Sequence, residues 1–400
     1  MRPALPAASL LAALALAAPA AHAQDAATRL ARDAVIVDTH IDAPGILMDT
    51  WADLGVEAKD REFDYPKARA GGLDIAFMSI YTSPKQDADG SAWQVANAMI
   101  DGVEALAQRH PGKFAVLTSP RDVDRLRAGG RVLLPLGMEN GAPLGDKLDN
   151  VRFFFERGVR YITLAHSANN RIADSSYALE KTWNGLSPFG REVVREMNRL
   201  GIMVDVSHLG DASAKEAIAL STVPVIASHS AFRHFTPGFE RNISDEIARL
   251  VAAKGGVIQV PFGTAFINPA SAANTQAHFR ATNDFNKRNA ELKAQGQPEL
   301  DRKAFDKAWD EAHPPLQSTL AQVLDQLDYG VELVGIDHVG IGSDFDGVDG
   351  ELPPELKTVG DFPHLVAGLQ ARGYRDADIR KLLGGNLLRA WSAIEAGAGK

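Results

Sequence analysis

Seven ionisable side chains lie at or just after the ends of short apolar runs in this sequence. They comprise four histidines and three carboxylates: His40, Asp42, Glu139, His166, His208, His229 and Asp344. Imidazole nitrogens and carboxylate oxygens suit zinc, and also manganese or cobalt. If the seven groups converge, their desolvation and mutual repulsion are costly without a bound cation. The pattern predicts a metal centre, although a histidine taken alone is more often a hydrogen-bonded core or loop residue.

The runs that carry these residues have the character of parallel strands separated by helices. Eight β-branched, apolar runs occur, at 34–41, 73–81, 132–138, 159–165, 202–207, 225–229, 256–262 and 338–343. Several are continuously apolar, as expected of strands buried on both faces. Together they predict an α/β fold of the (β/α)8 TIM-barrel class, in which the carboxyl ends of the strands converge on one face. We expect the seven side chains to meet there.

The position of a polar residue along its run separates expected site residues from others. Side chains two apart on a strand point the same way, so His40 and Asp42 are expected to face the barrel interior together. His338 begins its run and is expected to be structural, at the opposite face of the barrel. His234 lies in a loop, where a structural or a functional role is open.

The connections between the runs predict a single domain with two oversized insertions. The ranges 187–200 and 211–220 are each long enough for one crossover helix, and both have helical patterns. The stretch 83–131 is expected to hold a helix or two. The charged stretch 263–330 is expected to be helical, either covering the barrel mouth or decorating the outer ring. Because no internal repeat or low-complexity linker occurs, residues 24–400 are expected to form one barrel domain.

Composition narrows the classes of function. The chain of 400 residues is 45% hydrophobic, which is enough for a sizeable core. It has 42 basic and 51 acidic residues, a net charge of -9 and no basic run, so nucleic acid is not an expected partner. Cysteine is absent. Thiolate nucleophiles, disulfides and cysteine-ligated metals are thereby excluded, and a metal must be held by His, Asp or Glu.

The first 23 residues have the pattern of a secretory signal peptide. Arg2 supplies a positive charge, an apolar run follows at 10–18, and AHA at 21–23 offers a small-residue cleavage site. The apolar run is too short for a permanent membrane span. A retained N-terminal helix is the alternative. We expect a mature chain that begins near Gln24, is periplasmic or secreted, and has no membrane anchor.

Eight short motifs occur in order along most of the chain. They are VDTHIDAP at 37–44, GME at 137–139, RYITLAHSAN at 160–169, VDVSH at 204–208, SHSA at 228–231, RNISD at 241–245, HVGIGSDFDG at 338–347 and GGNLLR at 384–389. In these motifs the sequence resembles the membrane (renal) dipeptidase family, peptidase family M19, which comprises binuclear zinc hydrolases with the amidohydrolase-type barrel. Asn140 is a departure, since many relatives have Gly there. The cysteines and lipid-anchor tail of animal relatives are also missing.

The resemblance implies a role for each motif residue. The implied ligands of two zinc ions, which Mn2+ or Co2+ could replace, are two pairs and a bridge: His40 with Asp42, His208 with His229, and Glu139 between both ions. Asp344 matches the family's catalytic acid/base, and His166 and Arg241 match its substrate-binding positions. A homodimer is also what the resemblance suggests. The departures leave the side-chain preference for the substrate and the mode of oligomerisation open.

These residues suit hydrolysis of the peptide bond of a dipeptide by a hydroxide that bridges two zinc ions. Asp344 would accept the proton of the water and deliver it to the departing amine. His166 would stabilise the tetrahedral oxyanion. Arg241 would bind the C-terminal carboxylate of the dipeptide through its planar fork, unless it is a surface residue of a loop.

Two other functions stay open on sequence grounds. One is another barrel metallohydrolase of the amidohydrolase type, acting on a lactam, a lactone or a phosphoester. It would share the metal centre and differ only in its pocket. The other is a non-catalytic periplasmic binding protein with a vestigial metal site. All the expected ligands are present in the chain, whereas decay of a site usually removes one or two of them.

Overall fold

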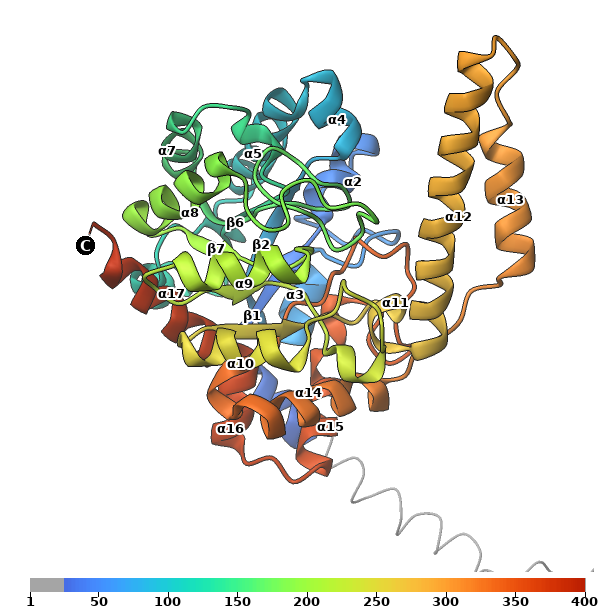
Figure 1. Ribbon diagram of the computed structural model, residues 1–400. Helices are drawn as coiled ribbons and strands as arrows, with labels where there is room; N and C mark the ends of the chain where they lie inside the picture. Colours follow the sequence, from blue (N-terminus) through green and yellow to red (C-terminus); the bar gives the residue numbers. More distant parts are fainter. Residues whose placement is uncertain (1–24, 400) are drawn as a thin grey trace, which may run out of the picture.

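The computed structural model describes residues 25–399 (Figure 1). Its core is a closed barrel of parallel strands. The barrel strands are β1 (Ile36–Ile41), β2 (Leu73–Tyr81), β5 (Leu136–Glu139), β6 (Val159–Thr163), β7 (Met203–Asp205), β8 (Ile226–Ala227), β9 (Val257–Val260) and β10 (Val339–Ile341). Consecutive members of this series pair in parallel. The barrel closes where Ile41 forms a parallel bridge with Phe345. The predicted (β/α)8 fold is confirmed.

The strands form where the sequence is continuously apolar because both of their faces are covered. Eight of the nine residues of β2 are buried, and all six residues of β1 are buried. Polar residues inside β1 bond to neighbouring strands. Thr39 Oγ1, for example, lies 3.1 Å from the carbonyl of Ile341 on β10, and it donates across the barrel to the carbonyl of Ser228 at 2.6 Å. Such bonds satisfy buried polar groups that would otherwise destabilise the barrel.

One predicted strand was wrong in its extent. The run 132–138 is divided into β4 (Val132–Leu134) and β5, and the residue between them is Pro135. Proline has no N–H to donate to a sheet, so it interrupts regular pairing. Together with β3 (Phe114–Val116), β4 extends the sheet outward from β2, and β5 continues around the barrel. The short strand β3 was not predicted.

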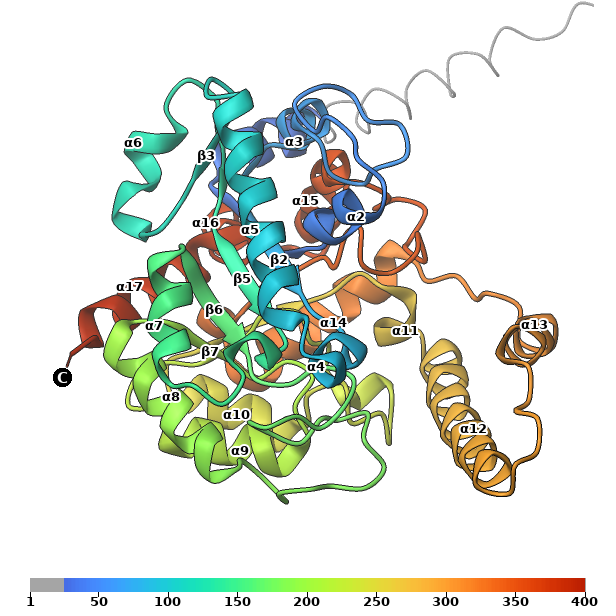
Figure 2. The ribbon, with the colours of Figure 1, turned by 90° about the horizontal axis from the view of Figure 1, so that it is seen from above.

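Most of the helices cover the outside of the barrel, and a few short ones lie at its mouth. They are α2 (Ala43–Asp49), α3 (Tyr65–Gly71), α4 (Pro84–Asp89), α5 (Ala92–Arg109), α6 (Val123–Arg127), α7 (Asp149–Glu156), α8 (Pro188–Leu200), α9 (Asp211–Leu220), α10 (Asp245–Ala253), α11 (Thr264–Ile267), α14 (Leu320–Val334), α15 (Phe362–Ala371), α16 (Asp376–Arg380) and α17 (Asn386–Gly397). Figure 2 shows α8, α9 and α10 in succession along one side, where each packs on the next. The helices expected at 187–200 and 211–220 are confirmed as α8 and α9.

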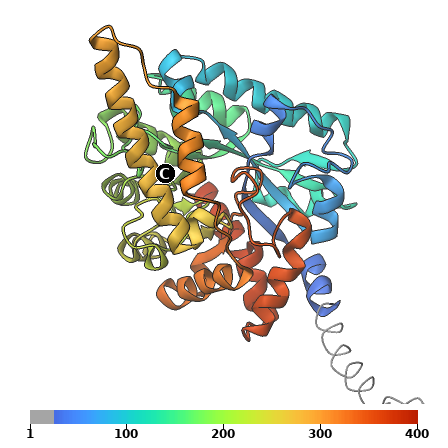
Figure 3. The same ribbon diagram turned by 90° about the vertical axis from the view of Figure 1, so that its right-hand side faces the viewer.

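A pair of helices projects from the barrel as an arm. It consists of α12 (Pro269–Ala294) and α13 (Arg302–Ala312), which run side by side in Figures 1 and 3. Aromatic pairs join the two helices, with ring centroids 4.7 Å apart for Phe285 and Phe305 and 4.9 Å apart for His278 and Trp309. The helical character expected for 263–330 is therefore confirmed.

None of the helices in residues 25–399 combines the length and the apolar character needed to cross a membrane. The expected signal peptide at 1–23 lies outside the described residues.

Candidate metal centre and active site

The ionisable residues singled out in the sequence meet at the carboxyl ends of the barrel strands. His40 lies on β1, Asp42 follows it directly, and Glu139 ends β5. The other four follow β6, β7, β8 and β10, respectively: His166, His208, His229 and Asp344. All seven lie in one cluster, as expected.

Glu139 occupies the centre of the cluster. Its Oε1 atom is 3.1 Å from Nε2 of His208 and 3.4 Å from Nε2 of His229. His166 Nε2 is 3.2 Å from the same oxygen. The other oxygen, Oε2, lies 3.4 Å from His40 Nε2. The two oxygens of one carboxylate thus face two different sets of nitrogen atoms.

His40 is fully buried among carboxylates. Its Nε2 atom is 3.3 Å from Asp42 Oδ2 and 4.0 Å from Asp344 Oδ1. This nitrogen has no hydrogen-bond partner within the described part of the chain. The His40 ring stacks on His229, with centroids 3.7 Å apart, so the two sets of donors adjoin. A cation stabilises such an arrangement of buried anionic groups around an unpartnered nitrogen.

Hydrogen bonds behind the cluster determine which ring nitrogens face it. Ser228 Oγ donates to Asp205 Oδ2 at 2.6 Å and lies 2.7 Å from His229 Nδ1. Because the hydroxyl hydrogen points to Asp205, Nδ1 of His229 donates to Ser228 and Nε2 keeps its lone pair. His40 Nδ1 lies 2.7 Å from the hydroxyl of Tyr161. Contacts of this kind orient metal-ligating histidines.

Burial and neighbouring charges set the protonation of the cluster. Burial lowers the pKa of His208 and His229 well below the usual range, so both rings are neutral, the form that binds a metal. Burial opposes ionisation of Glu139, but the adjacent histidines, His40 foremost, hold its pKa well below the usual range. His208 and His229 therefore present lone pairs to the interior of the cluster, and Glu139 presents negative charge. Burial opposes protonation of His40, but its neighbours, Tyr161 foremost and then Glu139 and Asp42, raise the pKa of this ring well above its usual range.

This set of donors fits divalent cations. Three overlapping groups each bring three ligand atoms within 4.8 Å of one another: His40–Glu139–His229, Glu139–His166–His208 and His40–Asp42–Asp344. Mixed nitrogen and oxygen donors match zinc, manganese or cobalt. Because the groups include His166 and Asp344, the two expected catalytic residues lie directly against the donor cluster.

Several residues of the site adopt the left-handed backbone conformation, which is unfavourable for most L-residues. The φ angle is 65° at His208 and 68° at Asp344. At Asn140 it is 76°, and asparagine is, after glycine, among the residues that tolerate this conformation best. Asn140 Nδ2 donates to the Thr82 carbonyl at 2.8 Å, and its Oδ1 accepts from Ala142 N at 3.2 Å.

Two reciprocal hydrogen bonds hold the loop that follows Asp344. The N–H of Glu62 donates to Asp346 Oδ1 at 2.9 Å, and the N–H of Asp346 donates to the Glu62 carboxylate. A Cβ at Gly347 would lie 2.3 Å from Asp42 Oδ2 and 2.5 Å from Asp344 Oδ1, so glycine is needed at this position. Glu62 lies 284 residues before Asp346, and sequence patterns gave no indication of the pairing.

Arg241 lies beside the cluster and is only 2% exposed, which excludes a surface role. Its Nη1 donates to Ser230 Oγ at 2.8 Å, and its Nη2 donates to the His229 carbonyl at 2.9 Å. Nη2 is also 3.0 Å from His208 Nε2. Nε is buried and has no hydrogen-bond partner in residues 25–399, and Arg241 is not among the residues that line the cavity over the cluster.

A cavity of about 640 Å³ opens over the cluster, and we call it the catalytic cavity. Its lining includes charged and aromatic side chains, among them Asp42, Glu139, His166, His208, Asp344, Tyr81, Tyr177, Phe266 and Phe279. Phe279 belongs to α12 and stacks on Tyr177 with centroids 4.3 Å apart. The arm therefore contributes to the mouth of the barrel through α12.

Two histidines noted in the sequence lie outside the cluster. His338 Nδ1 is 2.8 Å from the carbonyl of Gly256, just before β10 begins, as expected of a structural residue. The ring of His234 stacks on Tyr329 with centroids 4.2 Å apart. His234 therefore packs against an aromatic ring and lies apart from the cluster.

Three residues that support the ligands were missed by the sequence analysis: Tyr161, Asp205 and Ser228. Each lies inside a motif that had been noted for another residue. Asp205 and Ser228 are polar residues in otherwise apolar runs, next to or near a histidine, and that is the signal that could have found them.

Known proteins resemble this chain in sequence and in fold. The sequence model of the family described as membrane dipeptidase (peptidase family M19) matches residues 24–400. The chain belongs to this family. The resemblance seen in the motifs is thereby confirmed, and with it a divalent metal as the cofactor of the family.

Individual relatives show how far this membrane dipeptidase family member resembles known proteins. Dipeptidase 3 of Mus musculus is 28% identical over 381 residues, which cover 93% of this chain and 67% of the mouse protein. The crystal structure of the probable dipeptidase PvdM from Pseudomonas aeruginosa has a TM-score of 0.81 and 29% identity, and covers 94% of this chain and 99% of PvdM. A metallo peptidase from Rhodobacter sphaeroides, liganded with a phosphinate mimic of the dipeptide L-Ala-D-Ala, has a TM-score of 0.73 and 24% identity, with 90% and 99% covered.

Ser228→Ala is expected to weaken metal binding while the fold is retained. The change removes the acceptor for His229 Nδ1, and loss of such an outer contact typically costs about 10–100-fold in metal affinity. Competition with a chelator of known affinity measures the change. Ser213→Ala is the matched control, because Ser213 is also buried but donates to the Gly185 carbonyl, away from the cluster. Equal affinities for the two variants would contradict the proposed support.

Glu62→Gln is expected to alter the pH dependence of stability. Burial raises the pKa of Glu62 to about 7, above its ordinary value of 4.5. Between these values the folded protein binds more protons than the unfolded chain, so the wild type loses stability as pH rises from about 4.5 to 7. Glutamine keeps the acceptor for Asp346 N–H without the charge. Over this pH range the free energy of unfolding of the variant should rise by about 1–2 kcal/mol relative to that of the wild type, allowing for partial solvent screening.

Thermal unfolding at several pH values between 5 and 8 measures this difference. Glu180→Gln serves as the control, since the Glu180 side chain is 88% exposed. A stability difference between Glu62→Gln and wild type that stays constant with pH would show that Glu62 is ionised throughout.

Proposed function

We propose that this protein hydrolyses dipeptides with two divalent ions, zinc in the native enzyme, held between its barrel strands. The observation that carries the proposal is the position of Glu139. Its two oxygens face His40 on one side and His208 with His229 on the other. Asp42 completes the first set at 3.3 Å from His40. A carboxylate between two ligand sets is the arrangement expected of a bridging ligand.

When bound at such a centre, divalent ions lower the pKa of water and polarise a carbonyl oxygen. The chain's own residues orient the reactants. Burial raises the pKa of Asp344 well above the usual range, which suits a group that accepts and returns a proton near neutral pH. Its Oδ1 atom lies 4.0 Å from His40 Nε2, at the edge of the ligand set. We assign Asp344 to proton transfer from water to the leaving amine.

His166 lies against Glu139 Oε1 and Arg241 lies against His208, whereas Asp42 lies against His40. His166 Nε2 points towards Glu139, and its side chain lines the catalytic cavity, where it can donate to the oxygen of the carbonyl under attack. Arg241 lies directly behind the cavity lining, with its Nη2 3.0 Å from His208 Nε2, and its planar guanidinium suits the C-terminal carboxylate of a dipeptide. The L-Ala-D-Ala mimic held by the Rhodobacter relative supports a dipeptide as the substrate class.

Metal analysis and a substrate panel test the proposal. Two metal ions per chain are expected, with hydrolysis of L–L, L–D or D–L dipeptides in preference to a lactone or a phosphotriester. Asp344→Asn is expected to keep its metal and lose about 10²–10⁴-fold in kcat, the usual contribution of a general acid or base. Undiminished kcat in Asp344→Asn would remove its assigned role. A metal content well below two per chain would contradict the binuclear centre.

Arg241→Ala is expected to discriminate between dipeptides and their C-terminal amides. Loss of hydrogen bonds to a charged group costs about 1.5–3 kcal/mol, or roughly 10–150-fold in kcat/KM. The loss should fall on the free acids and largely spare the amides. Comparison of the two substrate forms within the same variant separates recognition from any effect of Arg241 on folding. Equal losses on both forms would argue against a carboxylate contact.

A further inference from the structure

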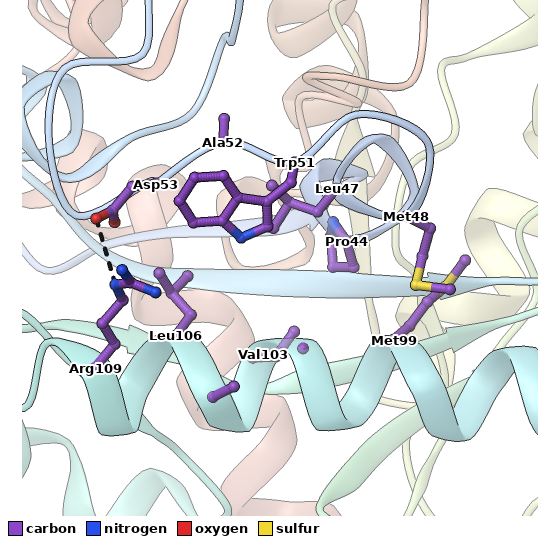
Figure 4. A pocket seen from close by; sticks show the side chains of 12 residues that line it. Pro44, Leu47, Met48, Trp51, Ala52, Asp53, Met99, Val103, Leu106 and Arg109 are labelled. Carbon is purple, nitrogen blue, oxygen red and sulfur yellow. Dashed lines mark ion pairs between the residues drawn. The ribbon is translucent and has the colours of Figure 1, made fainter.

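A second cavity, of about 260 Å³, lies beside the catalytic cavity between α2 and α5. Its lining is mainly apolar and comprises Pro44, Leu47, Met48, Trp51, Ala52, Asp53, Met99, Gly102, Val103, Ala105, Leu106 and Arg109. Figure 4 shows Trp51 lying across from α5, with the ion pair of Asp53 and Arg109 at one end. We call this space the apolar cavity.

The apolar cavity adjoins the catalytic cavity through two methionines. Met48 and Met99 line both spaces, and Figure 4 shows them together at the end away from Asp53. Methionine side chains are flexible and adapt to different neighbours, so this boundary can open without movement of the backbone. The α2 residues of the apolar cavity follow directly after Asp42, which joins them to the metal centre.

The charged residues around the catalytic cavity indicate which end of a bound dipeptide lies next to the apolar cavity. Arg241 lies beside His208 and is the assigned contact for the carboxylate. The part of the catalytic cavity next to α2 and the loop after β10 is lined by carboxylates, of which Asp49 and Asp346 are neither proposed metal ligands nor the proton-transfer group. A free ammonium group is favoured there by simple charge complementarity. The amino-terminal residue of a bound dipeptide would therefore lie next to Met48 and Met99.

We propose that the apolar cavity is a specificity subsite that receives a large apolar side chain of the amino-terminal residue of the dipeptide. The inference rests on the proposed dipeptidase function. A volume of about 260 Å³ exceeds that of several water molecules, each of which occupies about 30 Å³, and accommodates a leucine or phenylalanine side chain. The Trp51 side chain, 66% exposed, forms the outer wall, and the Arg109 guanidinium lies 5.5 Å from its ring centroid.

Gly102→Leu tests the subsite by filling it. A Cβ at Gly102 has no heavy atom within 4 Å, and the residue lies within α5, where leucine is a better helix former than glycine. The variant should fold normally. We expect kcat/KM for Leu-Ala and Phe-Ala to fall about 10-fold or more, because one or a few methylenes in an apolar pocket give about 10–200-fold discrimination. Cleavage of Gly-Ala should stay unchanged.

Gly112→Leu is the matched control, since a Cβ there also has open space and the residue lines neither cavity. A second variant, Trp51→Ala, removes the outer wall and should also reduce the preference for Leu-Ala over Gly-Ala. An unchanged preference in Gly102→Leu, or an equal loss on all three dipeptides, overturns the subsite while the dipeptidase function stands. If wild-type protein cleaves none of the dipeptides, the function itself fails, and the subsite with it.

Discussion

The structure depends on the placement of one buried carboxylate, that of Glu139, between histidines from different strands. Its oxygens lie 3.1 Å from His208 Nε2 and 3.4 Å from His40 Nε2, on opposite sides. Burying several carboxylates and histidine nitrogens together is costly in free energy, and bound cations offset that cost by neutralising the negative charge. The closed barrel satisfies this constraint by bringing the ends of β1, β5, β7 and β8 to one face.

The residues that contact the proposed ligands from behind mainly fix the positions and orientations of those ligands. Asp205 and Ser228 orient His229, Tyr161 contacts His40, and Glu62 holds the loop after Asp344. These contacts join strands that are distant in the sequence. Backbone hydrogen bonds hold the left-handed residues themselves: the His208 carbonyl accepts from Ser176 N–H at 2.8 Å, and the Asp344 N–H donates to the His40 carbonyl at 3.1 Å. Strained conformations persist only where the surroundings over-determine them.

Much of the fold and of the cluster could be predicted because local signals were strong. Apolar runs ending in His or carboxylate identified His40, Glu139 and Asp344, since parallel strands place such ends together. The division of 132–138 at Pro135 was missed, although proline is a local signal, because the apolar residues on both sides continue the run. Arg241 could be matched to a motif, but its burial beside His208 could not be inferred from its own segment.

The sequence by itself determined the kinds of ligand, the barrel class and the family, because residue types, hydrophobic periodicity and motif order are properties of the chain alone. Tertiary structure decided which ligands share an oxygen of Glu139, which imidazole nitrogen faces the centre, and that Met48 and Met99 separate two cavities. The physical reason is distance along the chain. Contacts such as Glu62 with Asp346, 284 residues apart, depend on barrel closure, which no local pattern encodes.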